Sequence, residues 1–344
     1  MGFDIQNRRY TGSKQKLVKW IRGIITKKCD NVNSFCDLFA GTGVVTNALI
    51  NDFSTFYIND FLYSNFIIYY AFFSSDAYSE EKLFVLKRQI ETIDPRNVKS
   101  NYVSKNFGGK FFSKNDSLVI GEIRELLENE KKADSINFRE FCILLSSLIY
   151  SFDRCANTVG HYDAYIKKPI LKDSFIFELI NPVITNQQDK RIFISCKDSN
   201  QLVREIQPDV VYIDPPYSSR QYSRFYHVIE NIAEWKKPKL YGTALKPAPE
   251  NMSDYCTVKA IDAFRELVAD LHCKYIVVSY NNTYDSKSSS SKNKMELEDM
   301  KKILDLKGHT TIFDINHKAF NAGKTDLKNH KELLFLTKVG EHDE

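Results

Sequence analysis

The sequence lacks the patterns typical of membrane, secreted and metal-binding proteins. No apolar run approaches the roughly 20 residues of a membrane span, and residues 1–7 do not form a signal peptide. The 7 cysteines stand singly, with no Cys-x-x-Cys pair and no cluster at metal-ligand spacing. Single cysteines of this kind are typical of reduced thiols, so we expect a cytoplasmic protein with no metal site.

The sequence also has no strong excess of charge of one sign and no internal repeats. The formal net charge is only +4, which permits a local basic patch for nucleic acid but does not demonstrate one. Hydrophobic residues make up 43% of the 344 residues, enough to bury a large core. This length allows a main domain with an insertion.

The most informative motif is Asp214-Pro215-Pro216-Tyr217, which directly follows the apolar run 209–213. That run is short and rich in β-branched residues, which predicts a buried parallel strand. Two consecutive prolines cannot continue a sheet ladder, so the chain must leave the sheet after Asp214. In open α/β sheets, ligands bind at this carboxyl edge. A carboxylate, a proline-fixed carbonyl and an aromatic ring could hold a planar base that carries an amino group.

A second motif is the apolar strand that runs into a glycine-rich turn at 34–43, with a helix expected to follow over 44–50. Gly41 and Gly43 permit positive φ angles or a close approach of the backbone. The next expected strand ends at Asp60, whose carboxylate could bind a ribose diol. The third glycine of the dinucleotide fingerprint is missing, and no basic residue is placed for a pyrophosphate. We therefore expect a nucleoside ligand without phosphates.

Together these residues resemble those of class I S-adenosylmethionine-dependent DNA adenine-N6 methyltransferases. The resemblance is strongest to the Dam-like D12 class, which includes methylases of type IIS restriction-modification systems, and it extends from the N-terminal signature at 8–14 over most of the chain. It implies that S-adenosyl-L-methionine is the cofactor and that adenine in a short specific sequence of double-stranded DNA is the substrate. It also implies a functional link to a cognate restriction endonuclease.

The fold class expected from this resemblance is α/β, with a Rossmann-like class I methyltransferase sheet and a mainly helical inserted DNA-recognition subdomain. We expect residues 1–74 and 186–344 to form the catalytic domain and residues 75–185 to form the inserted target-recognition subdomain. The last strand is expected to pair antiparallel, as it generally does in class I methyltransferases. The later strands are expected at 191–195, 210–213, 275–279, 311–315 and 332–337.

The resemblance also assigns cofactor contacts to several parts of the chain. The N-terminal segment would close over the methionine end, and the glycine turn would contact the amino-acid moiety and the adenosine. Asp60 would bind the ribose and Asp198 the adenine amino group; the alternatives are a helix cap for Asp60 and a plain turn residue for Asp198. The expected cofactor-binding residues are Tyr10, Lys14, Asp37, Phe39, Ala40, Gly41, Thr42, Gly43, Asp60 and Asp198.

Catalysis is expected at Asp214, Pro215, Pro216 and Tyr217. The amino nitrogen of adenine is a poor nucleophile because its lone pair is delocalised into the ring. Hydrogen bonds from its two protons to the Asp214 carboxylate and the Pro215 carbonyl would favour a more pyramidal, nucleophilic nitrogen. Tyr217 would stack on the base, which must be extruded from the duplex to be reached. The alternative is a structural Pro-Pro turn beside a surface acid.

DNA contacts are expected in the segment 151–162, which resembles a segment that Dam-like enzymes place against DNA near the flipped base. Arg154 can bind phosphate or guanine, and Asn157 can recognise an adenine edge or bind phosphate. His161 and Tyr162 could contact or stack on bases. The alternative is a capped helix end in which a buried Asn157 shapes the turn.

Basic and aromatic residues also alternate at 218–224, where Arg220 and Arg224 are expected to bind phosphates. The loops 286–292 and 316–324 are further candidates for a place near DNA.

Other functions fit the residues less well. Cytosine-N4 methyltransferases usually carry Ser-Pro-Pro, and glutamine-N5 and some RNA enzymes carry Asn-Pro-Pro-Tyr, so an N4-cytosine or RNA base methyltransferase remains the alternative. Cytosine-C5 chemistry requires a Pro-Cys pair, and the sequence contains none. A dehydrogenase is disfavoured by the missing third glycine. A non-enzymatic DNA-binding protein would not need the turn at 37–43.

Overall fold

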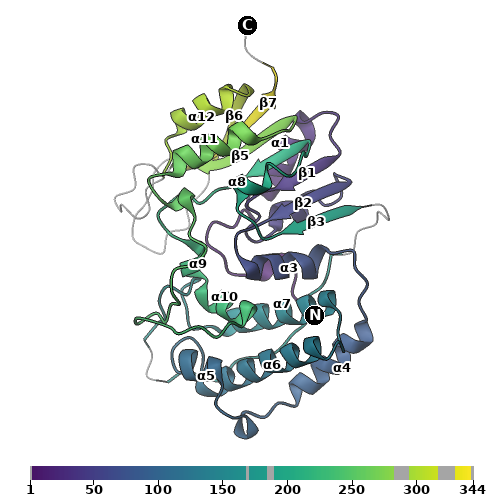
Figure 1. Ribbon diagram of the computed structural model, residues 1–344, viewed down its shortest axis with the longest axis vertical. Helices are drawn as coiled ribbons and strands as arrows, with labels where there is room; N and C mark the ends of the chain where they lie inside the picture. Colours follow the sequence, from purple (N-terminus) through teal and green to yellow (C-terminus); the bar gives the residue numbers. More distant parts are fainter. Residues whose placement is uncertain (1, 168–169, 184–189, 283–293, 317–329, 342–344) are drawn as a thin grey trace.

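The computed structural model describes residues 2–167, 170–183, 190–282, 294–316 and 330–341. The loop expected at 286–292, and all of the loop expected at 316–324 except its first residue, lie outside these ranges. The centre of the fold is a seven-stranded sheet of order β3-β2-β1-β4-β5-β7-β6 (Figure 1). Its strands are β1 (Ser34–Asp37), β2 (Thr55–Asn59), β3 (Arg191–Ser195), β4 (Val210–Ile213), β5 (Tyr275–Asn281), β6 (Gly308–Asn316) and β7 (Lys331–Val339).

The neighbouring strands from β3 to β5 pair in parallel, whereas β7 pairs antiparallel with both β5 and β6. The expected antiparallel last strand is therefore confirmed, and so is the Rossmann-like α/β class. The strand order reverses between β1 and β4, which lie side by side. In open α/β sheets this is the position where ligands bind, outside the carboxyl ends of the strands.

Side chains of successive strand residues point to opposite faces of the sheet and enter separate cores. Phe35 and Tyr212 pack on one face, whereas Cys36 and Val211 pack on the other. The first face is covered by α1 (Val18–Lys28) and α2 (Val44–Leu49), and the second by α8 (Ser199–Leu202), α11 (Ala260–Asp270) and α12 (Leu297–Asp305) (Figure 1). All four residues of β4 are buried because helices cover both faces.

A helical layer lies below the sheet in the view of Figure 1. It contains α3 (Tyr63–Phe73), α4 (Glu80–Glu91), α5 (Tyr102–Phe107), α6 (Lys114–Lys132) and α7 (Phe138–Cys155), joined by α9 (Tyr222–Phe225) and α10 (His227–Glu234). The helices α3 and α10 pack against α7, although they come from outside the segment 75–185. The helical layer is thus built from the segment 75–185 together with α3, which precedes it, and with α9 and α10, which follow β4.

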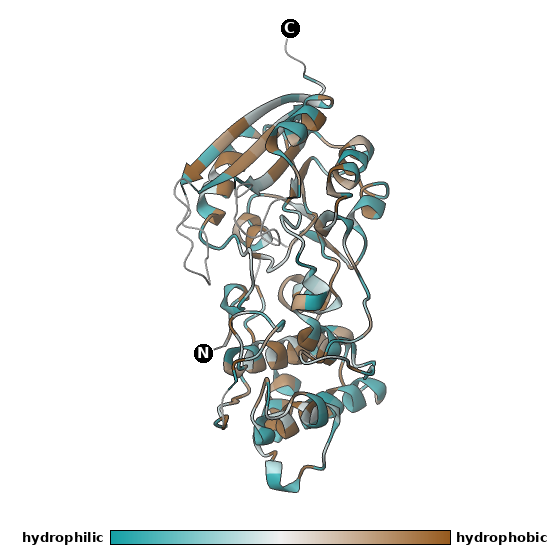
Figure 2. Cartoon of the chain, turned by 90° about the vertical axis from the view of Figure 1, so that its left-hand side faces the viewer, coloured by the Kyte–Doolittle hydropathy of each residue, from teal (hydrophilic) through white to brown (hydrophobic). Residues whose placement is uncertain are grey.

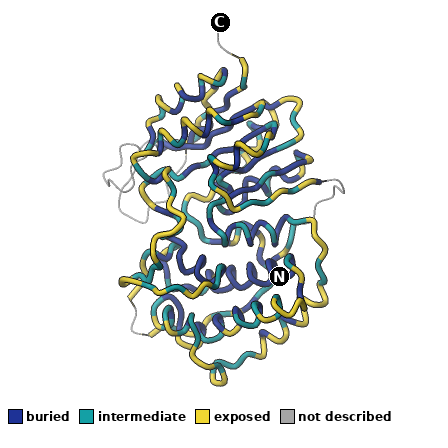
Figure 3. Tube along the Cα trace, viewed as in Figure 1, coloured by how far each residue is buried: buried dark blue, intermediate teal, exposed yellow. Residues whose placement is uncertain are grey.

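The helix α7 is the centre of this layer. Its first turn is fixed by a capping box, in which Asn137 accepts from Glu140 N at 2.9 Å and Glu140 accepts from Asn137 N at 2.8 Å. Residues 139–153 are all buried, as Figure 3 shows by the dark blue of this helix. Hydrophobic residues are concentrated in the sheet and in the helices below it (Figure 2). Truncating a fully buried side chain such as Phe141 would cost about 3–5 kcal/mol.

Three short 3-10 helices complete the described elements: η1 (Ile5–Asn7), η2 (Pro95–Asn97) and η3 (Asp254–Cys256). Within the described ranges, we find no helix with the length and apolar character needed to cross a bilayer.

Candidate cofactor and catalytic site

The two motifs meet at the carboxyl edge of the sheet. Because β1 and β4 are parallel neighbours, with Asp37 paired in register to Tyr212, the glycine turn and the Pro-Pro turn leave the sheet at the same edge. Gly41 and Gly43 have φ angles of 55° and 73°, in the left-handed region that glycine adopts at low cost. A Cβ on Gly43 would also lie 2.9 Å from the side chain of Ile5.

Asp60 lies against the glycine turn. Its Oδ2 accepts a hydrogen bond from Gly41 N at 2.9 Å, and its Oδ1 accepts from Leu62 N at 2.9 Å. Burial raises the pKa of the Asp60 carboxyl, and these hydrogen bonds oppose the rise only in part. The first amides of α3 are instead bound by a carboxylate from α10, since Glu230 accepts from Tyr63 N at 3.1 Å and from Ser64 N at 2.9 Å.

Asp37 ties β1 to α2. Its Oδ2 accepts from Thr46 N at 3.2 Å and from Thr46 Oγ1 at 2.7 Å. Its Oδ1 is buried and accepts no hydrogen bond from the described residues. Burial raises the pKa of Asp37 to about 7, partly offset by the Thr46 hydrogen bonds. Close to neutral pH this carboxyl group therefore exists in both its protonated and its ionised forms.

The N-terminal segment covers the glycine turn. The Tyr10 ring stacks on the Tyr226 ring at a centroid distance of 4.6 Å and lies 3.4 Å from the position of a Cβ on Gly41. The Ser13 and Thr42 hydroxyl oxygens lie 3.5 Å apart. Other predicted cofactor residues of the turn pack around it: the Phe39 ring meets Tyr255 edge-on at 5.1 Å, and Ala40 is buried.

Asp198 acts as a helix cap. Its Oδ1 accepts from Asn200 N at 3.0 Å and from Gln201 N at 3.2 Å, which fixes the first turn of α8. These hydrogen bonds engage Oδ1, and Asp198 lies just past β3 at the carboxyl edge, so its contact with the adenine amino group of the cofactor stays a prediction.

The Asp214 carboxylate is held by two donors. Its Oδ1 accepts a hydrogen bond from the Tyr217 hydroxyl at 2.5 Å and lies 3.2 Å from Lys14 Nζ. Lys14 Nζ also donates to the Tyr217 oxygen at 2.6 Å and lies 3.6 Å from Glu332 Oε2. Lys14, which the sequence predicted as a cofactor ligand, thus contacts the Asp-Pro-Pro-Tyr turn. The Tyr217 ring packs edge-on against Tyr280 at 4.6 Å.

The charges of this group compensate one another. Burial lowers the pKa of Lys14, but Asp214 and Glu332 outweigh burial, so that the net pKa is raised and the ammonium stays charged. Burial raises the pKa of Asp214, while Lys14 and the Tyr217 hydrogen bond oppose the rise. An ion pair of this kind is stable in a buried site only if both partners remain.

One of the predicted DNA-binding residues, Tyr162, points inward, which corrects the prediction for it. Its side chain is fully buried, and its hydroxyl donates to Asp153 Oδ1 at 2.8 Å. Asn157 is partly buried, and its Nδ2 donates to Lys110 O at 2.8 Å and to Ile166 O at 2.7 Å. These contacts shape the loop after α7, and a DNA contact of Asn157 stays a prediction.

The other predicted DNA-binding residues have at least partly accessible side chains. His161 stacks on Phe225 at 4.6 Å, and the Arg220 guanidinium lies 5.6 Å from the same ring. Arg224 donates to Pro247 O at 2.7 Å. Arg154 pairs with Glu178 at 3.1 Å and keeps 46% of its side chain exposed.

Several site residues were not predicted from the sequence. Glu332 lies on β7 beside Lys14, and its only signal was an acidic residue directly before the apolar run 333–336. Tyr222 and Tyr226 flank Tyr10, at centroid distances of 5.4 Å and 4.6 Å, and belong to the aromatic residues that follow the catalytic motif. No local pattern links these residues to the N-terminal segment.

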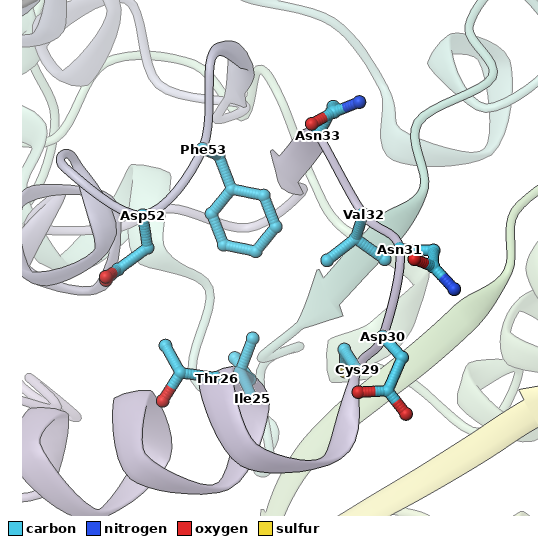
Figure 4. Close-up of a pocket in the computed structure, with 9 residues that line it drawn as sticks. All are labelled: Ile25, Thr26, Cys29, Asp30, Asn31, Val32, Asn33, Asp52 and Phe53. Atoms are coloured by element: carbon cyan, nitrogen blue, oxygen red, sulfur yellow. The ribbon is translucent and has the colours of Figure 1, made fainter.

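An open pocket lies elsewhere, between the end of α1 and the turns that precede β1 and β2 (Figure 4). Its lining includes Cys29, Asp52 and Phe53. It is at the amino edge of the parallel strands, opposite the two motifs, so we do not assign the site to it. Among the described residues, no group of three or more His, Cys, Asp and Glu side chains could hold a metal ion.

Comparison with known proteins agrees with the resemblance seen in the sequence. A sequence model of the family of D12 class N6 adenine-specific DNA methyltransferases matches residues 10–303. The modification methylase StsI of Streptococcus sanguinis is 32% identical over 290 residues, which cover 80% of this chain and 44% of that protein. The type II methyltransferase M.FokI of Planomicrobium okeanokoites is 30% identical over 289 residues, with the same 80% and 44% coverage.

The type II methyltransferase M.NlaIII of Neisseria lactamica is 28% identical over 337 residues, which cover 94% of this chain and 95% of that protein. The chain thus spans less than half of the StsI and FokI methylases and nearly all of M.NlaIII. Because the family match extends over most of the chain and includes both motifs at the carboxyl edge, the chain belongs to the D12 class of N6 adenine-specific DNA methyltransferases.

Proposed function

We propose that the protein transfers the methyl group of S-adenosyl-L-methionine to the N6 nitrogen of an adenine flipped out of a specific site in double-stranded DNA. The main support for this proposal is the position of Asp214. It directly follows β4, at the same sheet edge as the glycine turn after β1. An acceptor base bound by Asp214 would therefore lie close to a nucleoside bound at the turn. The site would act in the cytoplasm, where the host DNA is accessible.

The residues around the glycine turn fit the proposed cofactor. Asp60 is fixed beside Gly41, where its carboxylate would accept hydrogen bonds from the ribose hydroxyls. The buried Asp37 Oδ1, which accepts no hydrogen bond from the described residues, would accept one from the ammonium group of the methionine moiety. The Tyr10 ring over the turn would exclude water from that end. S-adenosyl-L-methionine, when bound, supplies an electrophilic methyl group on a positively charged sulfur.

The catalytic turn would bind the acceptor base. Asp214 and the Pro215 carbonyl would each accept a hydrogen bond from the adenine amino group. These hydrogen bonds would align the lone pair of the amino nitrogen with the methyl group. Pro216 limits the backbone freedom of the turn. Asp214 Oδ1 is bound by Tyr217 and Lys14 in the structure, and these two donors would orient the carboxylate toward the base. Tyr217 would then stack on the extruded base.

The segment 75–185 would form most of the target-recognition surface, with residues 1–74 and 186–344 as the catalytic part. Arg154, Arg220 and Arg224 would bind phosphates, and His161 would contact DNA from its stacked position on Phe225. Protection of host DNA from a cognate restriction endonuclease is the proposed biological role. The family disfavours the alternative of an N4-cytosine or RNA base methyltransferase.

The test is to incubate the purified protein with methyl-labelled S-adenosyl-L-methionine and unmethylated duplex DNA, and to digest the DNA to nucleosides. We expect the label in N6-methyladenine. Label in N4-methylcytosine, or in RNA but not in DNA, would contradict the proposal.

Substitution of Asp214 tests the proposed role of its carboxylate. Asp214→Asn and Asp214→Ala should each lower methyl transfer about 100-fold or more, because the amino group loses its charged acceptor. Binding of S-adenosyl-L-methionine, measured by calorimetry, should change little. Loss of folding in both variants would instead support a purely structural role for the turn.

A further inference from the structure

Lys14 lies between two carboxylates rather than one. Its Nζ atom is 3.2 Å from Asp214 Oδ1 and 3.6 Å from Glu332 Oε2. The exposed fractions of the three side chains are 6% for Lys14, 16% for Asp214 and 8% for Glu332. A single ammonium group is thus shared by the proposed catalytic acid and by a second, more deeply buried acid.

The second carboxylate comes from a distant part of the chain. Glu332 lies near the start of β7, where it pairs in register with Asn281 of β5 and Ile315 of β6. The residues that follow it on the strand, from Leu333 to Thr337, are all buried. A carboxylate at such a position costs several kcal/mol unless it is paired, so the pairing with Lys14 helps to stabilise it there.

Other titratable groups also surround this trio. Burial and the charges of both Asp214 and Glu332 raise the pKa of Tyr217 and of Tyr212. Asp37 faces Asp214 from β1, and Tyr222 faces it from α9. On β7, His330 Nε2 lies 3.5 Å from Glu332 Oε1. The nearest cation to Asp214 among these groups is Lys14.

We propose that Glu332 is a positioning residue for methyl transfer. It would keep the Lys14 ammonium group in place while the Asp214 carboxylate binds the amino group of adenine. This inference rests on the proposed function. Two donors engage Asp214 Oδ1 in the structure, and both compensate the negative charge that would bind the amino group of the base. Glu332 gives the ammonium group a second carboxylate at 3.6 Å, so Lys14 can loosen its contact with Asp214 and stay charged and buried.

Without the Glu332 charge, Asp214 would be the only carboxylate within 4 Å of Lys14 among the described residues. The ion pair would then compete with the adenine amino group for the negative charge of Asp214. We therefore expect Glu332→Gln, which preserves the shape of the side chain, to lower the single-turnover rate of methyl transfer about tenfold. Glu332→Asp retains the charge at shorter reach and should recover part of this loss.

A double-substitution experiment tests whether the effect passes through Lys14. Single-turnover transfer from labelled S-adenosyl-L-methionine to unmethylated plasmid DNA is measured for the wild type, Glu332→Gln, Lys14→Met and the double variant. Glu332→Gln should slow transfer only when Lys14 is present, since in Lys14→Met there is no ammonium group to hold. Equal slowing in both backgrounds, or no slowing in either, would overturn the proposal. Glu298→Gln, at an exposed position on α12, is the matched control and should have no effect.

The pH profile gives a second readout that a merely structural role would not move. Burial is the main cause that raises the pKa of Asp214, and Lys14 lowers it. The charge of Glu332 raises the same pKa further. Removal of this charge should therefore shift the acid limb of the single-turnover rate to lower pH. A reduced rate with an unmoved acid limb would contradict the proposal. If Glu332→Gln does not fold, Glu332→Met, of similar volume, replaces it in both experiments.

The controls also separate this proposal from the proposed function. If the wild type places no label in N6-methyladenine, the proposed function fails and this inference fails with it. If the wild type methylates adenine but the two substitutions act independently, only the role of Glu332 is lost.

Discussion

At the scale of single residues, Tyr217 contacts the carboxylate that the proposed reaction uses. Its hydroxyl donates to Asp214 Oδ1 at 2.5 Å, and its ring packs edge-on against Tyr280. In the proposed function the ring stacks on the extruded adenine, and Asp214 accepts a hydrogen bond from the adenine amino group. The hydroxyl and the base would therefore both bind the Asp214 carboxylate, whereas the ring and the base attract each other.

These contacts lead to a prediction for two variants of Tyr217. Tyr217→Phe keeps the ring and removes the hydroxyl donor, so we expect methyl transfer within about threefold of the wild type. Tyr217→Ala removes the ring and should lower transfer about tenfold or more, because stacking of a base on an aromatic ring contributes about 1–3 kcal/mol. Single-turnover assays with unmethylated DNA measure both variants. An equal loss in the two would assign the role to the hydroxyl instead of the ring.

At the scale of elements, α10 fixes the start of α3 through one carboxylate. Glu230 accepts from Tyr63 N and Ser64 N, the first two amides of α3. The negative charge lies at the positive end of the helix dipole, which favours the ionised form. Burial opposes it more strongly and raises the pKa of Glu230 from 4.5 to about 7. This contact links the helix after β2 to the helix after the catalytic turn.

The raised pKa predicts the direction of a pH effect on stability. Between about pH 4.5 and about pH 7 the folded state binds more protons at Glu230 than the unfolded state, so the free energy of unfolding falls as the pH rises. Glu230→Gln does not titrate and should reduce this fall by about 1–3 kcal/mol. Urea unfolding at about pH 5 and about pH 8 measures the difference.

Part of the slope should remain in Glu230→Gln, because Asp37 has a pKa raised to about 7 and titrates in the same window. Glu122→Gln, at an exposed position on α6, is the control and should leave the whole slope unchanged. An unchanged slope in Glu230→Gln as well would mean that Glu230 is already ionised at the lower pH.

At the scale of the whole molecule, the sheet and the helical layer are joined through the segments that carry the proposed DNA contacts. Tyr162 N donates to Phe225 O at 2.7 Å, which ties the loop after α7 to the segment after the catalytic turn. Lys246 pairs with Asp163 across the same region. His161 and Arg220 meet at Phe225, so residues far apart in the sequence form one surface beside the catalytic turn.

We predict that Arg220→Ala weakens DNA binding about three- to tenfold and lowers the slope of log affinity against log salt by about one, as expected for one lost phosphate contact. Fluorescence anisotropy with a labelled duplex at several salt concentrations measures both quantities. Arg204→Ala removes an exposed arginine that pairs with Glu266 and Asp270 on another part of the surface, and should change neither. Equal effects of the two variants would mean that binding follows net charge instead of this surface.

Much of the fold could be predicted because its signals are local. The strands expected at 191–195 and 210–213 have the observed bounds, and the last strand is antiparallel as expected. The turns after β1 and β4 were marked by glycines and prolines, whose backbone limits are independent of their surroundings. The meeting of the two motifs at one sheet edge then follows from the parallel pairing of these strands.

The sequence by itself thus determined the α/β class, the family and the two motifs at the carboxyl edge. Only the tertiary structure decided that Lys14 lies between Asp214 and Glu332 and that Tyr162 points inward. Hydrophobic periodicity and turn residues report backbone conformation and burial within a few residues of chain. Side-chain pairing depends on which strands become neighbours, and β7 lies beside β5 only after the whole sheet has formed.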